Sequence, residues 1–444
     1  MVRQAADQPP ARRGIPLRGN GYRWSQALLA LVIMLLISPY EYCFTIFEKP
    51  IAAAHNWDLP SVATTYTIYI IVASLTMIPS GLWSDRWQPR WFTTVAGIIT
   101  GLGWIFAAFA NTQIELYIAY AFGALGPGYI YCNCVNNALK WFPESRGRGT
   151  AVGLIDMGFG LGSAIFIPIL TPVLTGSKDG YKSAFIGMGI AMLVVIVVAA
   201  QFLKFPEKDW LPPGYDPAAD TRKSVHGLGN ATVDFTPLQM VKTWQYWWSL
   251  VGLCFISAAG LMITAHIAVV AGAEVAIGGV GVGTAAATFS RIPNGVMRWV
   301  SGTISDYFGR ERLMFIFFVL MGIFTYLMTV THVGWAFVLV ALLAMGCWGP
   351  LFTLYPALVS DYWGRKNSGI NYGLIYGPGK GLAGVFAGTI AASLHDSTGS
   401  WTVPFEVAAA LAIVSGLMAL ALRRPKAVSP VSSPVVTATA QAAP

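Results

Sequence analysis

Charged residues are scarce in this sequence. Asp, Glu, Lys and Arg make up 11% of the 444 residues, while hydrophobic residues make up 55%; a soluble globular chain has about 25% charged residues. Cysteine is also rare: the five cysteines lie in apolar stretches, without a Cys-x-x-Cys pair or a histidine at metal-ligand spacing. The composition therefore predicts a protein that crosses a membrane several times, with neither a disulfide framework nor a metal site.

The sequence also lacks the motifs of the common enzyme classes. It has no His-Glu-x-x-His, no Gly-x-Ser-x-Gly and no pair of intramembrane carboxylates at metal-ligand spacing, so an intramembrane enzyme is not predicted. A phosphate-binding P-loop is absent as well, which argues against transport driven by ATP. No cofactor is expected.

Long apolar runs are what the sequence has in abundance. A helix needs about 20 mainly apolar residues to cross a bilayer, and twelve stretches of roughly that length are separated by polar segments. We predict an all-α membrane protein with twelve transmembrane helices in two six-helix repeats. The expected spans are 24–47, 61–83, 92–110, 115–139, 149–173, 183–203, 245–271, 280–304, 313–331, 335–359, 369–394 and 402–422.

The segments outside these spans define the domains. Residues 1–22 carry prolines and arginines without an apolar core, which predicts a disordered tail. Residues 423–444 are rich in Ala, Pro, Val and Ser and form a second predicted tail. The polar segment 204–243 is expected to be a linker. It joins two predicted six-helix bundles, 23–203 and 244–422.

The distribution of basic residues predicts the orientation. In the twelve-helix interpretation, 22 of the 28 Lys and Arg residues lie on the side that holds both termini and the linker. The opposite side has only Lys49, Lys178 and Lys182. The positive-inside rule therefore places both termini in the cytoplasm. The net charge of +8 reflects this topology, and no nucleic-acid partner is expected because no single basic patch exists.

An internal repeat is visible at one fixed offset along the chain. The turn GLWSDRWQPR, with Gly81 and Asp85, corresponds to GTISDYFGRER, with Gly302 and Asp306. Trp141-Phe142 corresponds to Tyr362-Trp363 at the same offset. Two halves of common plan are implied, as in one large class of secondary transporters. We predict that the two turns act as hinges or gates, and their residues are Gly81, Asp85, Arg86, Gly302, Asp306 and Arg310.

The doubled Gly-x-x-x-Asp turn, the two groups of six spans and the central linker resemble the major facilitator superfamily. The resemblance covers roughly residues 24–422. Three stretches resemble more narrowly the oxalate/formate antiporter family, bacterial carriers of small carboxylates related to the eukaryotic monocarboxylate transporters. These stretches are FGALGPGYIYCNCVNNALKWFPESRGRGTAVG, the NGVMR of the eighth span and the NYGLIYGPGKG of the eleventh.

This resemblance implies a substrate site. In that family an arginine of the eighth span and a lysine of the eleventh bind substrate carboxylates, and the matching residues here are Arg298 and Lys380. Tyr42 and Tyr131 resemble positions that offer hydroxyl groups to the substrate, and Trp348 resembles one that walls off the site. For these three aromatic residues, packing or a place at the membrane interface is an equally open interpretation.

Two features of the sequence depart from the family. Pro378 lies between Gly377 and Gly379, just before Lys380, so we expect the helix to be unwound there. Two charged residues, Asp156 and Arg291, stand where uncharged residues are expected. Arg291 is expected to pair with Glu41 or Asp156, since a buried guanidinium needs a partner.

The two buried acids are candidates for proton coupling. In the related monocarboxylate carriers an aspartate precedes the arginine of the eighth span by one turn, but here that position is Asn294. Asp156 could supply the titrating group instead, and Glu41 is a second candidate, expected nearer the outer mouth. The alternative is that Asp156 forms a permanent ion pair with Arg291.

The sequence thus predicts a secondary transporter of small carboxylates in the cell (inner) membrane, which functions as a monomer. Proton-linked symport of a monocarboxylate such as formate or lactate is favoured, with H+ as the coupling ion. Oxalate/formate-type exchange without protons is the alternative, and an anion channel or a non-transporting receptor is the alternative of another class. Duplicated halves with charged turns favour alternating access over a channel.

Overall fold

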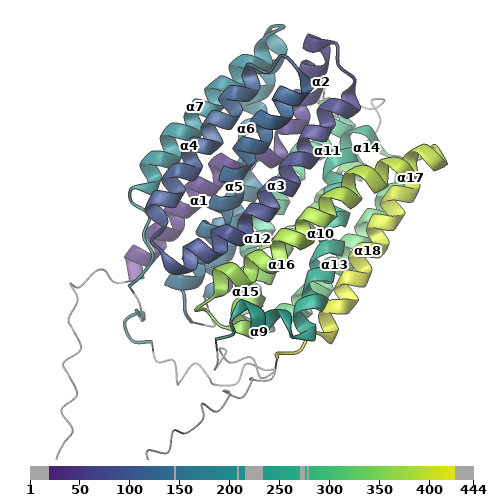
Figure 1. Ribbon diagram of the computed structural model, residues 1–444. Helices are drawn as coiled ribbons and strands as arrows, with labels where there is room; N and C mark the ends of the chain where they lie inside the picture. The colour runs from purple at the N-terminus through teal and green to yellow at the C-terminus, as the bar shows by residue number, and fades with distance from the viewer. Residues whose placement is uncertain are drawn as a thin grey trace, which may run out of the picture.

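The structure is a helical bundle. The computed structural model describes residues 20–144, 147–207, 210–215, 234–270, 276–277 and 280–425. Figure 1 shows long helices running side by side, with the short helix α9 at the lower end. We call this lower end, which also carries the turns at Gly309 and Gly364, the linker end.

The first half contains five long helices and one helix broken near its middle. The break separates α1 from α2 at Cys43. Pro39, four residues earlier, has no backbone N–H group and so removes one hydrogen-bond donor from the helix. The helices of this half are α1 (Asn20–Tyr42), α2 (Phe44–His55), α3 (Leu59–Arg86), α4 (Pro89–Ala108), α5 (Gln113–Trp141), α6 (Arg148–Gly176) and α7 (Gly180–Ala200).

The second half has more interruptions. One expected span is divided at Ser290, another at Gly349-Pro350, and a third contains a π-helical turn. The elements are α9 (Pro237–Val241), α10 (Trp244–Val270), β1 (Ala276–Ile277), β2 (Val280–Gly281), α11 (Val282–Phe289), α12 (Arg291–Phe308), α13 (Arg310–Val330), α14 (Gly334–Trp348), α15 (Leu351–Trp363), α16 (Ser368–Val385), η1 (Phe386–Ile390), α17 (Ala391–Thr398) and α18 (Thr402–Ala421).

The all-α membrane fold is confirmed, whereas the count of twelve spans stays a prediction. Within the described residues, nine helical segments are long and apolar enough to cross a bilayer. The three expected spans outside this group correspond to α5, to α11 with α12, and to α16 with its π-helical turn. These three carry Tyr131, Arg298 and Lys380. Their low hydropathy thus accompanies the polar side chains from which a substrate site was predicted.

The predicted domain boundaries fall close to the helix ends. The helix α1 begins at Asn20, inside the predicted tail 1–22, and α18 ends at Ala421. The segment 204–243 contains α9 near its end. Residues 1–19, 216–233 and 426–444 lie outside the described part of the chain, so the predictions for the tails and for most of the linker are untested there.

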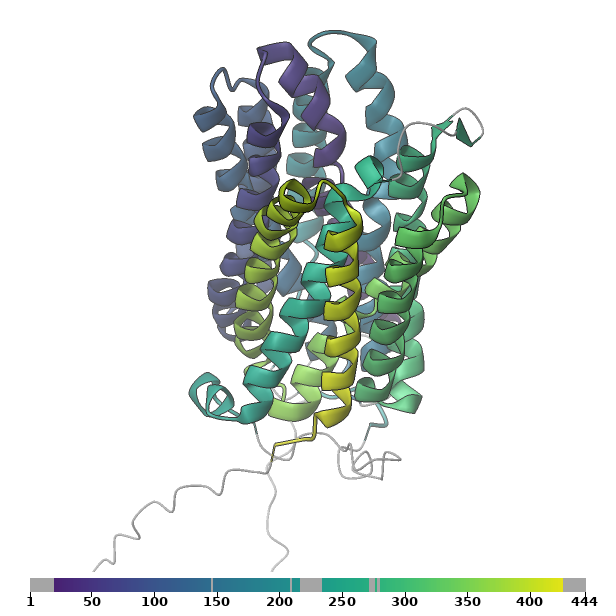
Figure 2. The ribbon, with the colours of Figure 1, turned by 90° about the vertical axis from the view of Figure 1, so that its right-hand side faces the viewer.

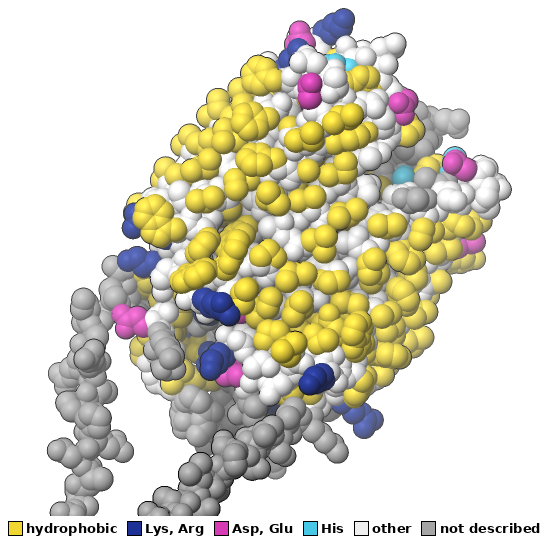
Figure 3. Space-filling view, in the orientation of Figure 1, with side chains coloured by type: hydrophobic (Ala, Val, Ile, Leu, Met, Phe, Trp, Pro, Cys, Tyr) yellow, Lys and Arg dark blue, Asp and Glu magenta, His cyan; other side chains and the backbone are white. Residues whose placement is uncertain are grey.

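Hydrophobic side chains cover the lateral surface of the bundle (Figure 3). Most of the Lys and Arg side chains visible in this view lie toward the linker end. A lateral apolar band with charges at its ends is the surface that a bilayer requires. The cytoplasmic position of the linker end follows from the positive-inside rule and stays a prediction.

Two helix pairs join the halves. Helix α3 packs along α16, and α6 packs along α12; Figures 1 and 2 show that α16 and α3 run side by side. The repeat offset relates α3 to α12, so both pairs have the same construction. Both are packed backbone to backbone: a Cβ added at Gly81 would lie 2.3 Å from the carbonyl oxygen of Gly369, and one at Gly302 would lie 2.2 Å from that of Gly149.

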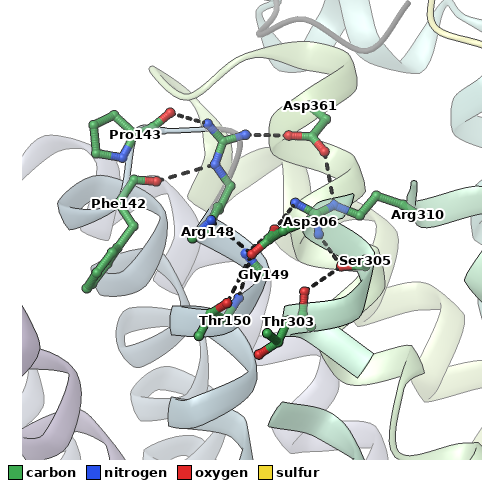
Figure 4. Close-up of polar contacts among 12 residues, drawn as sticks. Phe142, Pro143, Arg148, Gly149, Thr150, Thr303, Ser305, Asp306, Arg310 and Asp361 are labelled. Carbon is green, nitrogen blue, oxygen red and sulfur yellow. Dashed lines mark hydrogen bonds and ion pairs between the residues drawn. The ribbon is translucent and has the colours of Figure 1, made fainter. Parts of the chain in front are cut away.

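Asp306 of α12 forms hydrogen bonds to the start of α6 at the linker end (Figure 4). Its carboxylate accepts hydrogen bonds from the backbone N–H groups of Gly147, Gly149 and Thr150, at 2.9, 3.0 and 3.1 Å, at the start of α6. These N–H groups have no partner inside their own helix, and the positive end of the helix dipole favours a carboxylate there. We call this set the Asp306 contact.

Two arginines extend the Asp306 contact into a row of alternating charges. Arg310 Nη2 lies 2.8 Å from Asp306 Oδ1, and Arg310 Nε lies 3.2 Å from Asp361 Oδ2. Asp361 also pairs with Arg148 of the first half, as Figure 4 shows. Each of these buried or half-buried charges has a partner of opposite sign, which offsets the cost of removing it from water.

Asp85 makes the equivalent contact in the α3–α16 pair. Its two oxygens accept from the N–H groups of Gly369 (3.1 Å) and Ile370 (2.9 Å) at the start of α16. Asn136 Nδ2 also donates to Asp85, at 3.0 Å. Arg86, the other charged residue predicted to act here, is exposed at the end of α3. We call this set the Asp85 contact.

Valine at either Gly81 or Gly302 is expected to slow turnover by about tenfold, the effect of roughly 1–3 kcal/mol of overpacking on one conformational state. The added side chain collides with backbone of the partner helix, so the halves cannot close at the linker end as they do here. Equilibrium substrate binding should change little, because the atoms met by the added side chains are not among the groups that hold the Arg298 guanidinium. Uptake rates in proteoliposomes and calorimetric binding in detergent measure the two effects.

Gly187→Val is the matched control, since a Cβ at this glycine of α7 meets no atom within 4 Å. This variant should transport like wild type. Equal loss of binding and turnover in both interface variants would show that these glycines support folding only.

Candidate functional site

The candidate site lies at the end of α1, where this helix of the first half contacts two helices of the second half, α12 and α16. Glu41 and Tyr42 are consecutive residues in the last turn of α1. Glu41 contacts Lys380 of α16, and Tyr42 contacts Arg298 of α12. A single turn of α1 therefore reaches both cations that the sequence predicts to bind substrate.

Arg298 is fully buried and is held by neutral groups. Its Nη2 donates to the hydroxyl of Tyr42 (3.1 Å) and to Oδ1 of Asn294 (3.0 Å), and its Nη1 donates to the backbone carbonyl of Asp156 (3.5 Å). Asn294 is fixed in turn by donating to the carbonyl of Met345 at 3.0 Å. No carboxylate lies within 4 Å of the guanidinium among the described residues, and its Nε has no hydrogen-bond partner there.

Aromatic rings surround this guanidinium. The Arg298 Cζ lies 3.9 Å from the ring centroid of Phe352 and 5.6 Å from that of Phe159. Tyr131 contacts both Phe159, at 5.3 Å between centroids, and Tyr376, at 5.5 Å. We call Tyr42, Tyr131, Phe159, Phe352 and Tyr376 the aromatic box. Its faces stabilise the cation and exclude water, which strengthens electrostatic interactions inside.

Lys380 faces the same aromatic box but has an acidic partner. Its Nζ lies 2.7 and 2.8 Å from the two carboxylate oxygens of Glu41. It also lies 5.4 Å from the ring centroid of Phe352 and 5.9 Å from that of Phe159. Both members of the ion pair are buried, at 4% exposure for Lys380 and 2% for Glu41. Arg298 and Lys380 thus face the same aromatic box, and Glu41 neutralises the charge of Lys380.

The expected unwinding near Lys380 does not occur. Residues Gly377–Gly379 lie inside the continuous helix α16, and Pro378 is accommodated within it. The irregular part is the π-helical turn η1, which begins six residues after Lys380. A proline costs one backbone hydrogen bond, and the neighbouring glycines pack closely against other helices, so packing maintains the helix here.

A small cavity borders the ion pair. Its free volume is about 20 Å³, about enough for a single water molecule. Its lining includes Glu41, Tyr131, Phe159, Tyr376 and Lys380, together with further residues of α3 and α5. A carboxylate ligand of several heavy atoms needs more room, so its binding requires side chains of the box or of the ion pair to move.

Asp156 lies fully buried next to this group. Neither of its carboxylate oxygens forms a hydrogen bond of normal geometry among the described residues, and the same holds for the hydroxyl of Tyr131, which is the polar side chain that interacts with this carboxylate. The nearest charges that act on Asp156 are those of Arg298 and Lys380. A carboxylate in this position interacts with the site by charge, without being held in an ion pair.

The expected partner of Arg291 is wrong. In the part of the chain that the structure describes, this arginine forms no ion pair with Glu41 or Asp156. It donates instead to Thr264 Oγ1 at 3.3 Å and lies over the ring of Tyr42, 4.7 Å from its centroid. Glu41 is paired with Lys380 of α16 instead, whose ammonium lies within hydrogen-bond distance of both carboxylate oxygens. The expectation that Glu41 lies nearer the outer mouth stays a prediction.

Trp348 is positioned behind the site. It donates from Nε1 to the carbonyl of Ile256 at 3.0 Å and packs against Gly260 of α10. Its ring contacts Phe352, 5.0 Å between centroids, and Phe352 in turn covers Arg298. Trp348 therefore orients Phe352, and its predicted direct role as a wall of the substrate site stays a prediction.

Sequence reasoning missed three aromatic residues beside the cations: Phe159 and Phe352, whose rings lie near both, and Tyr376, whose ring lies 5.4 Å from Lys380 Nζ. The offset that relates Asp85 to Asp306 also relates Tyr131 to Phe352 and Phe159 to Lys380. These pairs therefore occupy equivalent positions in the two halves. Applied to the helix interiors as well as to the turns, the offset would have pointed to Phe159 and Phe352.

The sequence model of the Major Facilitator Superfamily matches residues 27–298 and 283–444. The chain belongs to this superfamily. Like other members of the Major Facilitator Superfamily, it is a multi-pass membrane protein with a transporter fold. The prediction of the superfamily from the doubled turn is confirmed.

Relatives within the Major Facilitator Superfamily include carboxylate carriers. The chain is 26% identical over 417 residues to the oxalate:formate antiporter of Oxalobacter formigenes, covering 93% of this chain and 94% of that protein. It is 25% identical to monocarboxylate transporter 11 of Homo sapiens, over 77% of this chain and 70% of that one.

Solved structures show the same fold. The proton:xylose symporter XylE bound to 6-bromo-6-deoxy-D-glucose superposes with a TM-score of 0.71 over 91% of this chain and 96% of its own, at 13% identity. FucP in the outward conformation superposes with a TM-score of 0.62 over 89% and 97%, also at 13% identity. At this identity the likeness concerns only the fold of the Major Facilitator Superfamily.

Proposed function

We propose that this protein is a secondary transporter of small carboxylates in which Arg298 is the principal substrate-binding group. One observation carries the proposal: Arg298 is fully buried between the halves, and no carboxylate of the described residues lies within ion-pair distance. A guanidinium without an ion-pair partner is costly in a membrane interior. An anionic substrate supplies such a partner, and a carboxylate matches the planar fork of donors.

The surroundings of Arg298 favour a small substrate. The aromatic box closes tightly around the two cations, and the neighbouring cavity holds about one water molecule. Formate, lactate and oxalate fit this description better than citrate or a sugar. The carboxylate-transporting relatives support the same substrate class.

The interface between the halves supports alternating access. The Asp306 contact and the Asp85 contact close the linker end through equivalent interactions of the two halves. Opening that end breaks both sets at once, and a return to the closed state restores them. By the positive-inside rule the linker end faces the cytoplasm, so we assign the described state to one closed on the cytoplasmic side of the inner membrane. The protein acts as a monomer in this scheme.

For coupling, we favour symport of a monocarboxylate with H+. Asp156 is buried beside Arg298 and has no ion-pair partner in the described chain, so it can gain a proton when substrate binds and lose it when substrate leaves. The second candidate is anion exchange, which the oxalate:formate relative favours. A cationic site without bound anion hinders the change between inward-open and outward-open states, so the protein would return only with a substrate bound.

Transport by purified protein in proteoliposomes tests this function. Uptake of labelled formate, lactate and oxalate is measured with and without unlabelled carboxylate on the far side. A carrier shows acceleration by the far-side substrate, whereas a channel shows none, and a receptor binds without uptake. Movement of neutral sugars or citrate alone would contradict the assignment.

A further inference from the structure

The ion pair between Glu41 and Lys380 makes the two cations of the site unequal. Lys380 contacts both oxygens of Glu41 at 2.7 and 2.8 Å, while Arg298 is held only by uncharged groups. Both cations nevertheless face the rings of Phe159 and Phe352. The site therefore offers one unpaired cation and one that already carries a carboxylate.

We propose that Glu41 acts as an internal carboxylate that occupies Lys380 and selects substrates with a single carboxylate group. This inference rests on the proposed function and specifies its substrate class. A monocarboxylate binds Arg298 and leaves the ion pair intact. A short dicarboxylate places its second carboxylate against Glu41, or must displace Glu41 from Lys380.

Burial makes this discrimination strong. Glu41 is 2% exposed, so a displaced carboxylate of Glu41 has no access to water where it stands, and an unpaired buried charge is costly. Two carboxylates sharing one lysine repel each other in a medium of low dielectric constant. The small volume beside the pair, about 20 Å³, leaves little room for both groups.

Oxamate and oxalate test the inference because they have the same shape. Oxamate carries an amide in place of the second carboxylate, and this amide can donate to Glu41. Wild-type protein in detergent at neutral pH should bind oxamate at least about tenfold more tightly than oxalate, measured by calorimetry and by ligand-induced thermal stabilisation. Tighter binding of oxalate by wild type would overturn the inference without any variant.

Glu41→Gln keeps the volume of the side chain and removes its charge. Lys380 is then available to a second carboxylate, so the preference should reverse, and oxalate should bind at least about tenfold more tightly than it does to wild type. Glu48→Gln is the matched control: Glu48 lies seven residues further along, in α2, and has no ion-pair partner in the described chain. It should keep the preference of wild type.

The outcomes separate this inference from the proposed function. Unchanged preference for oxamate in a folded Glu41→Gln protein overturns the role of Glu41, while carboxylate transport by wild type still stands. Absence of binding for both ligands in wild type contradicts the carboxylate site itself. If Glu41→Gln does not fold, the comparison of the two ligands in wild type decides alone.

Discussion

Replacing Arg298 by lysine is expected to lower carboxylate uptake by about 10- to 100-fold, the loss of one charged hydrogen-bond pairing worth about 1.5–3 kcal/mol. Lysine keeps the positive charge but cannot present two parallel donors to a carboxylate. It also cannot hold Tyr42, Asn294 and the Asp156 carbonyl together while lying flat on Phe352. Initial uptake rates and substrate affinity of Arg298→Lys in proteoliposomes give the measurement.

A matched control makes the same change outside the site. Arg312 is exposed near the start of α13, so Arg312→Lys should transport at the wild-type rate. Equal amounts of folded protein must be verified by size-exclusion chromatography. Wild-type uptake by Arg298→Lys would remove this residue from substrate binding.

Asp156→Asn is expected to abolish accumulation driven by a pH gradient and to leave exchange intact. An amide cannot carry the coupled proton, and it replaces the carboxylate that is buried beside Arg298 without an ion-pair partner in the described structure. With one proton per substrate, a gradient of about one pH unit supports at most about tenfold accumulation in wild type, since about 1.4 kcal/mol is a tenfold ratio. The variant should stay near the level reached without a gradient.

Asp179→Asn serves as the control for this experiment, because Asp179, the residue before α7, is exposed, and its one ion-pair partner among the described residues is Lys182 in the first turn of that helix. It should accumulate substrate like wild type. Accumulation in wild type that ignores the imposed gradient would instead favour anion exchange, and gradient-driven accumulation that survives in Asp156→Asn would move the proton site elsewhere.

The fold could be predicted from the sequence because composition, the length of apolar runs and the repeat offset can all be read along a single chain. The scarcity of charge and the length of the apolar runs define a membrane protein. The fixed offset that relates the turn of Asp85 to the turn of Asp306 indicates two related halves, and both aspartates do make equivalent contacts at helix starts. The sequence did not indicate which helix start each aspartate contacts, because a short turn motif carries no information about its partner in the other half.

The sequence predicted members of the candidate site but not how they pair. The sequence predicted Arg298, Lys380, Tyr42 and Tyr131 one by one. In the structure the two tyrosines belong to the aromatic box that the two cations face. Arg291 was assigned the wrong partner, because Glu41, Asp156 and Lys380 lie on three different helices. Helix periodicity specifies which face a residue occupies, and it does not specify which face of another helix lies opposite.

By itself, then, the sequence determined the membrane setting, the repeat and the presence of buried charges, since each depends on composition or on spacing along one chain. The tertiary structure alone decided that Glu41 neutralises Lys380 across 339 residues and that Arg298 has no acidic partner in the described chain. The physical reason is that an ion pair in a low-dielectric interior depends on distances of a few ångströms between helices. Those distances are set by the packing of α6 against α1 and α12 and of α3 against α16, which is a property of the assembled bundle.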